Sequence, residues 1–440
     1  MRGGYTLCMK QHSLPKHTIV TKQLYGGARL VYVRIPKSSL SAVSVWFQAG
    51  SRFDPPGKEG LAHFLEHLYM GRTARFPKKI DKLQSLESKG IYTNAYTNYE
   101  TAHFYHIQAR ELLFDSLDML LDGMFHARIS SADVQREKNI IVDERQRTLG
   151  SPFDYTTNLS CGVLWPKSAL GRPFFGTEKT IRSITLFDIQ AFQEHFYIPE
   201  NATFVIVGDV SARILGEYMN AYLQRFSRTK SKSTFTPAPD DFSYGPLRTY
   251  LEKAKDPRVQ IGLHYQGSSL QNRDWVVLDF IRDYLTNQWI SKLMIALRLR
   301  HDFTYWVDGH TTHFSDVGLI RFLYTTDKQN VRGSIRMSLR VIENVTASLQ
   351  RTSQLRAHKT AFVASFLRNT QDIYDVLWWY GWQGALAPSV ISMEEYLEDV
   401  RSLTPRHIRS VAKRYLRAEN RSITLLGNFD QTVLNFLKEM

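Results

Sequence analysis

The sequence predicts an α+β fold made of two homologous α/β sandwich-like halves, each an antiparallel-rich sheet packed with helices. Two observations support this prediction: a helix–turn–strand pattern occurs twice, and in each half a strand-like segment precedes a long helical one. At roughly 150 residues per domain, a chain of 440 residues suggests two or three domains, and its 43% hydrophobic content is ample for sizeable cores. We therefore expect a globular protein with two similar halves.

The repeated pattern lies at residues 183–210 and 402–430. Each segment is typical of a helix, a turn and then a strand, with another helix following. A constant separation of 219 positions relates Thr185 to Thr404, Phe196 to Tyr415, Asn201 to Asn420 and Gly208 to Gly427. This constant separation indicates an internal repeat.

Strand-like segments at residues 42–51 and 259–269 lie near the beginning of the two halves. Between the halves, residues 227–246 are rich in Ser, Thr, Pro and charge, which is the composition of a linker. The predicted parts are an N-terminal extension at 1–20, a first domain at 21–226, the linker at 227–246 and a second domain at 247–440.

The N-terminal residues and the two cysteines bear on the cellular compartment. The N-terminal segment has no apolar core of signal-peptide length. The lack of acidic residues before Asp54 resembles a transit peptide, but a strand pattern already begins near Thr21. Cys8 and Cys161, the latter in a predicted loop, give no disulfide framework and suggest a reducing compartment. We expect a cytoplasmic protein of bacterial type, with an organelle as the open alternative.

The formal net charge of +14 makes nucleic acid, anionic membranes and acidic peptides candidate partners. The basic residues are scattered, however, and no zinc-finger, RRM or P-loop pattern occurs. No apolar run approaches the roughly 18 residues of a membrane span, and the apolar stretch at residues 376–382 is too short. We expect neither nucleic acid nor a membrane as a partner, and interpret the charge as a modest bias on substrate choice.

A candidate metal site lies at residues 61–71, LAHFLEHLYMG. On a helix with about 100° per residue, one arc holds Leu61, Phe64, Leu65 and Leu68, and the opposite side holds His63, Glu66 and His67. Histidines at i and i+4 can both direct ring nitrogens at one ion at ~2.0–2.1 Å. A solvated polar face is the alternative interpretation.

Two histidines rarely hold a catalytic zinc alone, so a third protein ligand is expected. The helix predicted at residues 132–147 turns one arc inward, and Glu137 and Glu144 lie within that arc. Buried carboxylates need a cation or strong hydrogen-bond donors, and an arginine partner is the alternative to a metal. The residues that mark the inward arc are Val134, Ile140 and Ile141.

The order H-x-x-E-H reverses the common zincin motif and is typical of the inverzincin group. Together with residues 70–105 it is similar to the M16 family of zinc peptidases, the group of pitrilysin, insulin-degrading enzyme and mitochondrial processing peptidase. The resemblance covers nearly the whole chain, from residues 27–67 through residues 170–185 to the repeated C-terminal half. One departure is Ile91, where many members have a second glycine, and it concerns only the local turn.

The resemblance implies a zinc site with one ion per chain. By that resemblance His63, His67 and Glu144 match the zinc ligands. Glu66 matches the catalytic base, which would accept a proton from zinc-activated water and deliver it to the leaving amine. Glu137 matches a supporting glutamate of the metal site, and a plain ion pair is the alternative for this residue.

A segment at residues 93–101 matches the family strand that pairs with the substrate backbone. Its recognisable positions are Asn94, Ala95 and Thr97. Pairing of this kind requires an extended peptide as the substrate.

A segment in the second half, residues 297–307, resembles the one that contacts the substrate across the cleft. Arg298 and Tyr305 occupy the matching positions, where the tyrosine hydroxyl would stabilise the developing oxyanion. Asp302 replaces a glycine of the family in this segment. A core tyrosine and a surface arginine are therefore the alternative interpretation.

The remaining histidines are interpreted as structural. In HTTH, residues 310–313, the i and i+3 side chains point to opposite faces of the strand that the context suggests. No partner at ligand spacing accompanies His103, His106 or His126, so none is assigned a role.

The expected function is zinc-dependent hydrolysis of peptide bonds in short or unfolded peptides, bound as an added β-strand in a closed chamber. A non-catalytic assembly subunit is one alternative, which the intact ligand set disfavours. A presequence-processing subunit is another, but its basic substrates would not be attracted by a chain of charge +14 unless the chamber were locally acidic.

The resemblance also implies a partner chain. Family members that carry both halves twice in one polypeptide close a chamber around the substrate, whereas this chain has one pair of halves. A homodimer is expected, in which Arg298 and Tyr305 of one subunit face the zinc site of the other. A heterodimer with a non-zinc homologue is the alternative.

Overall fold

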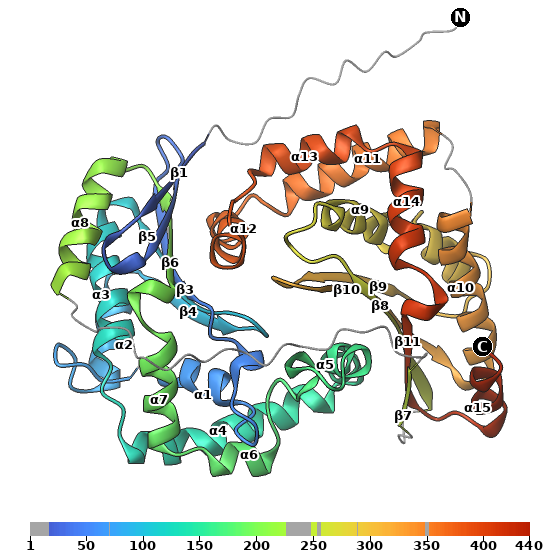
Figure 1. Cartoon of the computed structure of the whole chain (residues 1–440), viewed down its shortest axis with the longest axis horizontal. Coiled ribbons are helices and arrows are strands. Elements are labelled where there is room, and N and C mark those ends of the chain that lie inside the picture. The colour runs from blue at the N-terminus through green and yellow to red at the C-terminus, as the bar shows by residue number, and fades with distance from the viewer. Residues whose placement is uncertain (1–16, 70, 226–247, 253–256, 288, 348–351) are drawn as a thin grey trace, which may run out of the picture.

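A computed structural model describes residues 17–69, 71–225, 248–252, 257–287, 289–347 and 352–440. The described chain forms two mixed sheets with helices packed around them (Figure 1), which confirms the predicted α+β class. The predicted linker at 227–246 and most of the predicted extension at 1–20 lie outside the described residues. The proposed domain boundaries therefore stay a prediction.

The first sheet has the strand order β1-β2-β6-β3-β5-β4. Neighbouring strands pair antiparallel except β2 and β6, which are parallel. The strands are β1 Thr18–Gln23, β2 Arg29–Arg34, β3 Leu40–Phe47, β4 Tyr92–Thr97, β5 Ala102–Ala109 and β6 Ala202–Gly208. The helices of this half are α1 Leu61–Leu68, α2 Lys79–Ser88, α3 Leu113–His126, α4 Ser131–Gly150, α5 Pro152–Leu164, α6 Glu178–Ser183, α7 Leu186–Phe196 and α8 Ala212–Arg225.

The second sheet has the order β7-β11-β8-β10-β9, with β7 and β11 parallel and the other pairs antiparallel. Its strands are β7 Arg248–Glu252, β8 Arg258–Gly267, β9 Val307–His313, β10 Gly318–Asp327 and β11 Arg421–Gly427. The helices are α9 Asp274–Thr286, the π-helix η6 Met294–Leu299, α10 Val331–Ala347, α11 Thr352–Arg368, α12 Ile373–Leu386, α13 Met393–Ser402, α14 Pro405–Tyr415 and α15 Gln431–Lys438. Single turns of 3₁₀ helix are η1 Tyr25–Gly27, η2 Ser51–Phe53, η3 Arg110–Leu112, η4 Ala169–Gly171, η5 Pro199–Asn201, η7 Lys328–Asn330 and η8 Ala418–Asn420.

The repeated segments form the same elements, α7–β6–α8 in the first half and α14–β11–α15 in the second. Thr185 and Thr404 each cap a helix, because each hydroxyl accepts a hydrogen bond from the backbone of the first turn. The side-chain amides of Asn201 and Asn420 each donate to the carbonyl five residues earlier, at 2.8 and 2.7 Å. The repeat therefore preserves the local hydrogen bonds that join helix to strand.

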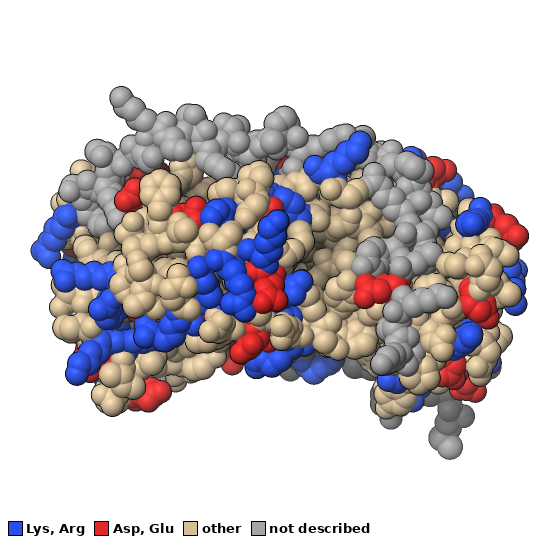
Figure 2. Space-filling model, turned by 90° about the horizontal axis from the view of Figure 1, so that it is seen from below, with Lys and Arg blue, Asp and Glu red and all other residues tan. Residues whose placement is uncertain are grey.

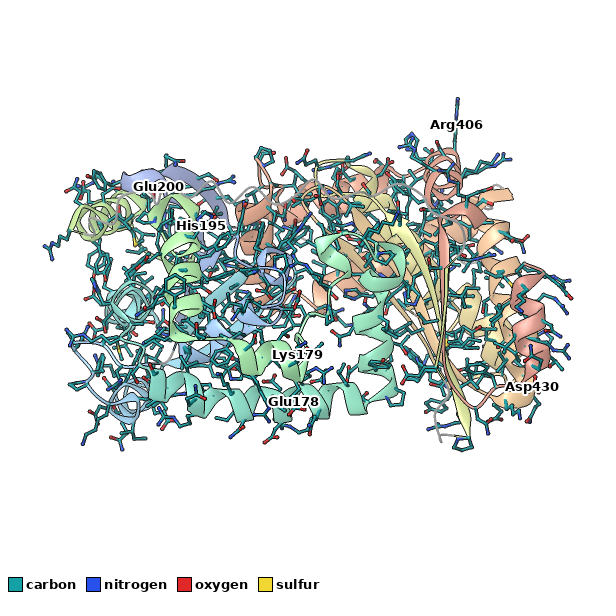
Figure 3. The ribbon with its side chains drawn as sticks, turned by 60° about the horizontal axis from the view of Figure 1, so that its bottom comes forward. Glu178, Lys179, His195, Glu200, Arg406 and Asp430 are labelled. Carbon is teal, nitrogen blue, oxygen red and sulfur yellow. The ribbon has the colours of Figure 1, made fainter. Side chains whose placement is uncertain are left out.

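The two halves exchange one helix each across the middle of the molecule. Helix α12, from the second half, packs on β3 and β6 of the first sheet, whereas α5, from the first half, packs on β8 and β11 of the second (Figure 1). Figure 3 shows α5 leaving the end of α4 and reaching the yellow strands of the second half. The exchange fixes how the two sheets face each other.

We expect Gly381→Ala to destabilise this packing. A Cβ atom at Gly381 of α12 would lie 2.2 Å from the ring of Trp46 on β3. Overpacking of this kind lowers the free energy of unfolding by about 1–3 kcal/mol, which thermal denaturation of the full chain measures as a lower Tm. The matched control is Gly216→Ala in α8, where a Cβ meets no atom within 4 Å. An unchanged Tm for Gly381→Ala would contradict the close contact.

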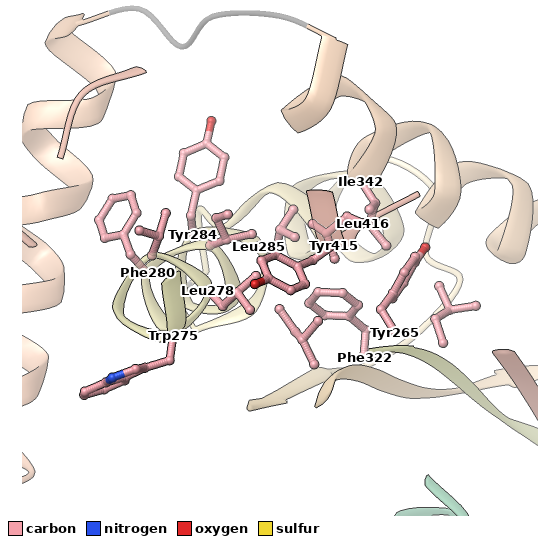
Figure 4. Packing of buried hydrophobic residues seen from close by; sticks show 14 of the residues in the cluster. Tyr265, Trp275, Leu278, Phe280, Tyr284, Leu285, Phe322, Ile342, Tyr415 and Leu416 are labelled. Carbon is pink, nitrogen blue, oxygen red and sulfur yellow. The ribbon is translucent and has the colours of Figure 1, made fainter. Parts of the chain in front are cut away.

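In the second half, a core of buried hydrophobic residues surrounds α9 (Figure 4). Side chains of Phe322 and Tyr265 rise from the sheet toward Leu278 and Leu285 of α9. Because side chains alternate along a strand, Leu319 and Arg321 of β10 lie on the opposite face of the sheet from Phe322. That opposite face is the one that borders the candidate site.

Two local sequence predictions were wrong. Cys161 is not in a loop but lies in α5, where it is buried against the second half. Ile140 does not mark the inward arc of α4, because its side chain is 45% exposed, whereas Val134 and Ile141 are buried as expected.

The surface charges and the apolar content of the helices are described for the residues that the structure covers. Lys and Arg side chains on the face shown in Figure 2 are interspersed with Asp and Glu. Within the described ranges, none of the helices has both the length and the apolar content needed to cross a membrane.

Candidate metal centre

Helix α1 is held at its N-terminus by a buried carboxylate. The Asp54 side chain accepts hydrogen bonds from the backbone N–H groups of Gly60 and Ala62, at 2.7 and 2.8 Å. Gly60 has φ = +97°, a left-handed conformation that glycine adopts without strain. These contacts set the direction in which the first turn of α1 presents His63.

The segment after α5 packs against this helix. Rings of Phe174 and Phe175 lie 6.2 and 5.1 Å from the His63 ring, measured between centroids. Arg172 donates to the backbone carbonyls of Asp54 and Arg52 at 2.6 and 2.9 Å, which ties the segment to the turn before α1. The residues 170–185 that matched the family pattern therefore support the candidate metal site structurally.

The two histidines of α1 face Glu144 of α4. The Nε2 atom of His67 lies 3.0 Å from Oε2 of Glu144, and Nε2 of His63 lies 3.8 Å from Oε1. One candidate ligand atom from each of the three residues lies within 4.8 Å of the others. In the described part of the chain this is the single group of three or more His, Cys, Asp or Glu residues with such spacing.

The donor set fits a zinc ion. Two imidazoles and one carboxylate are ligands of catalytic zinc sites, which leave a fourth position open. The His63 Nδ1 atom is buried without a hydrogen-bond partner among the described residues, and both Nε2 atoms point toward the same carboxylate. Among the described residues Glu144 lies within ion-pair distance of the two histidines and of no arginine; Arg147 acts on its pKa only from farther away.

Glu137 lies on the side of the His67 ring that faces away from Glu144. Its Oε2 atom is 3.6 Å from Nδ1 of His67, and its Oε1 atom is 3.8 Å from Nζ of Lys79. A carboxylate behind a ligating histidine fixes the tautomer and orientation of the ring. Glu137 thus lies within ion-pair distance of both His67 and Lys79, a position compatible with the supporting role or the ion pair predicted from the sequence.

Burial and mutual contacts shift the pKa values of His63, His67, Glu137 and Glu144. Burial lowers the pKa of His63 to about 4, and the neighbouring His67 adds to the shift. Burial also disfavours the charged form of His67, but hydrogen bonding to Glu137 and Glu144 outweighs it and raises its pKa to about 9. The same contacts with His67 lower the pKa of both glutamates, which are therefore ionised at neutral pH.

Glu66 lies beside the group without being part of it. It lines the same cavity as His63 and Glu144. Burial raises the pKa of Glu66, and its neighbour Thr97 at the end of β4 opposes the shift. A carboxylate with a raised pKa next to a metal site is suited to accept and return a proton.

The cavity has a volume of about 920 Å³ and lies between the two halves. Strand β4 runs along it, and Asn94, Ala95 and Thr97 all line it. Because β4 is the outermost strand of the first sheet, its free edge can accept another strand. The structure thus brings the predicted substrate strand and the candidate metal group to one cavity.

Arg298 and Tyr305 do not lie in this cavity. The Arg298 guanidinium donates a 2.7 Å hydrogen bond to the Tyr305 carbonyl and stacks 4.1 Å from the Tyr305 ring and 4.4 Å from the Trp289 ring. Tyr305 is 77% exposed, so it is not the core tyrosine considered as an alternative. The pair forms an exposed cluster outside the cavity.

The HTTH segment is strand β9, as the sequence suggests, and it borders the cavity. His313 is structural: its Nε2 lies 3.0 Å from Oδ1 of Asp279 and its Nδ1 lies 3.0 Å from the Ser268 carbonyl. Sequence reasoning assigned no role to this wall. It also missed the cavity-lining residues Tyr96, Arg321, Trp378 and Trp382. The available signals were an arginine inside the apolar strand GLIRFLY and the cluster of tryptophans at 378–382.

The sequence matches two family models. Residues 29–177 match the model described as insulinase, peptidase family M16, and residues 183–360 match the M16 inactive domain. An uncharacterized zinc protease of Streptomyces coelicolor is 23% identical over 430 residues, which cover 96% of this chain and 92% of that protein. The beta subunit of the mitochondrial-processing peptidase of Saccharomyces cerevisiae is 22% identical, covering 93% and 91%.

Solved structures show the same fold. A protease from Helicobacter pylori superposes with a TM-score of 0.86 at 21% identity and covers 94% of this chain and 100% of its own. A peptidase M16 inactive domain protein from Pseudomonas fluorescens gives 0.84 at 16% identity, covering 93% and 98%.

Proposed function

The chain belongs to the M16 peptidase family, and from that premise we propose that it is a zinc-dependent endopeptidase acting on short or unfolded peptides. The observation that supports this best is the convergence of His63, His67 and Glu144 beside Glu66, in a cavity that runs along the free edge of β4. A structural subunit has no need of all four groups at one place.

We propose that His63, His67 and Glu144 hold one zinc ion and that Glu137 orients His67 through its Nδ1 atom. Zinc, when bound, supplies a Lewis acid that lowers the pKa of water to about 7. Glu66 accepts the proton of the attacking water and then delivers it to the amine nitrogen of the leaving fragment. The raised pKa of Glu66 lies closer to neutral pH, which makes it easier for this carboxylate both to accept a proton and to release it.

We propose that the substrate lies extended beside β4. A peptide there forms backbone hydrogen bonds with the free edge of the strand, and its scissile bond lies over α1. Folded proteins offer few free extended segments, so short or unfolded peptides are the expected substrates. A closed chamber around this peptide requires surfaces beyond the cavity of about 920 Å³ that borders β4.

We propose a homodimer that completes this chamber. Arg298 and Tyr305 lie outside the cavity of their own chain and are available to a second subunit. Large exposed apolar side chains surround them: Trp289, Ile290, Leu299 and Trp306, between 44% and 60% exposed. A heterodimer remains the second candidate, because one relative is the beta subunit of a processing peptidase.

The dimer is tested by mixing two inactive variants, Glu66→Gln and Tyr305→Phe. If Tyr305 acts across the interface, one site in each mixed dimer has both groups intact. Half of the dimers are mixed, so about a quarter of wild-type peptide hydrolysis should return. As the control, Glu66→Gln mixed with His63→Ala leaves every site defective and should restore nothing. Failure of the first mixture to regain activity, or full activity from a monomer by light scattering, would rule out the arrangement.

A further inference from the structure

The wall of the cavity opposite β4 contains a buried arginine, Arg321. It lies on β10, paired with His310 of β9 and His264 of β8, and is 8% exposed. Its Nε atom is buried and has no hydrogen-bond partner among the described residues. A buried N–H group that lacks a partner is costly, so a guanidinium group with such an atom at a cavity surface is suited to a ligand.

Arg321 has one acidic neighbour and forms no ion pair among the described residues. On the α5 side its neighbours are Cys161 and Tyr99, both uncharged because burial raises the pKa of each. Burial and the charges of Arg321 and Arg282 lower the pKa of His310 to about 3, so this ring is neutral. Asp308 on β9 is the acidic group whose charge acts on Arg321, and burial raises the pKa of that carboxyl.

Arg321 shares its cavity with the proposed reaction centre. Tyr96 of β4 senses both: burial raises the pKa of Tyr96, the Glu66 carboxylate adds to the shift and the Arg321 guanidinium opposes it. Arg321, Tyr96 and Glu66 all line the one cavity. A peptide lying beside β4 therefore has part of its length within reach of Arg321.

We propose that Arg321 binds a carboxylate of the peptide substrate and so selects peptides that bring an acidic group to this wall. The planar guanidinium matches a carboxylate with two parallel hydrogen bonds. The carboxylate comes either from the C-terminus of the peptide or from an Asp or Glu side chain. This inference rests on the proposed peptidase function, and it makes the basic presequences considered above poor substrates, because an arginine wall repels them.

Peptide binding tests the inference without requiring hydrolysis. Three labelled peptides share one neutral sequence: the first has a free C-terminus, the second is amidated, and the third is amidated with one glutamate scanned along it. Fluorescence anisotropy with zinc-loaded full-length Glu66→Gln protein gives each Kd. We expect a carboxylate-bearing peptide to bind about ten- to a hundredfold more tightly than the neutral amide, the range of one hydrogen bond to a buried charge.

Variants at Arg321 then assign the preference. Arg321→Gln, in the Glu66→Gln background, should remove the preference, so that peptides with and without a carboxylate bind with the same Kd. The rise in Tm on adding zinc reports separately on folding. Arg321→Lys keeps the positive charge and should retain part of the preference for carboxylate-bearing peptides. The control is Arg213→Gln, an exposed arginine of α8 paired with Glu217, which should alter nothing.

The peptides distinguish the two sources of the carboxylate. A preference for the free C-terminus alone identifies a terminal subsite, whereas one for the scanned glutamate identifies side-chain specificity. Equal binding of all three peptides overturns the inference, and so does a preference that survives in Arg321→Gln. Because the assay measures binding, a protein that binds acidic peptides but hydrolyses none would contradict the proposed peptidase function and leave the Arg321 site standing.

Discussion

Replacing Glu66 by glutamine is expected to lower the rate of peptide hydrolysis by about 10²–10⁴-fold, the contribution of general acid–base catalysis. The amide keeps the size of the side chain at the end of the cavity beside Thr97 but can no longer accept a proton from water. Glu66 is not among the three residues whose ligand atoms converge, so bound zinc should be unchanged.

The experiment compares kcat and zinc content in the same preparations. Metal is measured by atomic emission after gel filtration, and hydrolysis with a quenched fluorescent peptide. Glu87→Gln, an exposed glutamate of α2, serves as the matched control and should behave as wild type. Near-normal turnover in Glu66→Gln would refute the role of the proton acceptor, and loss of zinc would instead make Glu66 a ligand.

Removing two proposed ligands should abolish both zinc binding and hydrolysis. In the double variant His67→Ala, Glu144→Gln, one imidazole and the anionic carboxylate are lost, and only His63 remains of the group. The fall in zinc affinity should exceed the roughly 100-fold that follows loss of an outer-shell partner. No peptidase activity is expected at any zinc concentration that leaves the protein soluble.

Two readouts separate metal loss from misfolding. Zinc that binds only the folded state raises the Tm, so adding zinc to metal-free wild type should raise the Tm, and adding it to the double variant should not. Asp143→Asn, an exposed neighbour of Glu144 on α4, is the control and should retain zinc and activity. Equal zinc content in wild type and the double variant would disprove the assigned ligand set.

Local sequence patterns were sufficient for the helix that bears the histidines. The i, i+4 spacing of His63 and His67 sets both rings on one face of α1, because 3.6 residues complete a turn. The same periodicity brought Glu137 and Glu144 to the buried side of α4, although it wrongly included Ile140. A helical wheel shows which residues share an arc of a helix. It does not show how much of that arc the neighbouring elements bury, and this is why Ile140 was included wrongly.

By itself, therefore, the sequence determined the repeated elements, the α+β class and the common face of His63 and His67, since each depends on residues a few positions apart or on a direct repeat. Glu144, on a separate helix, was predicted as their partner through the family resemblance. Only the tertiary structure decided that α5 and α12 exchange between the halves, that Arg321 faces the β4 edge across one cavity, and that Tyr305 lies outside it. These arrangements depend on packing between segments hundreds of residues apart. A helix with an apolar stripe buries that stripe equally well against either sheet, so which sheet it covers is decided only when the whole chain is assembled.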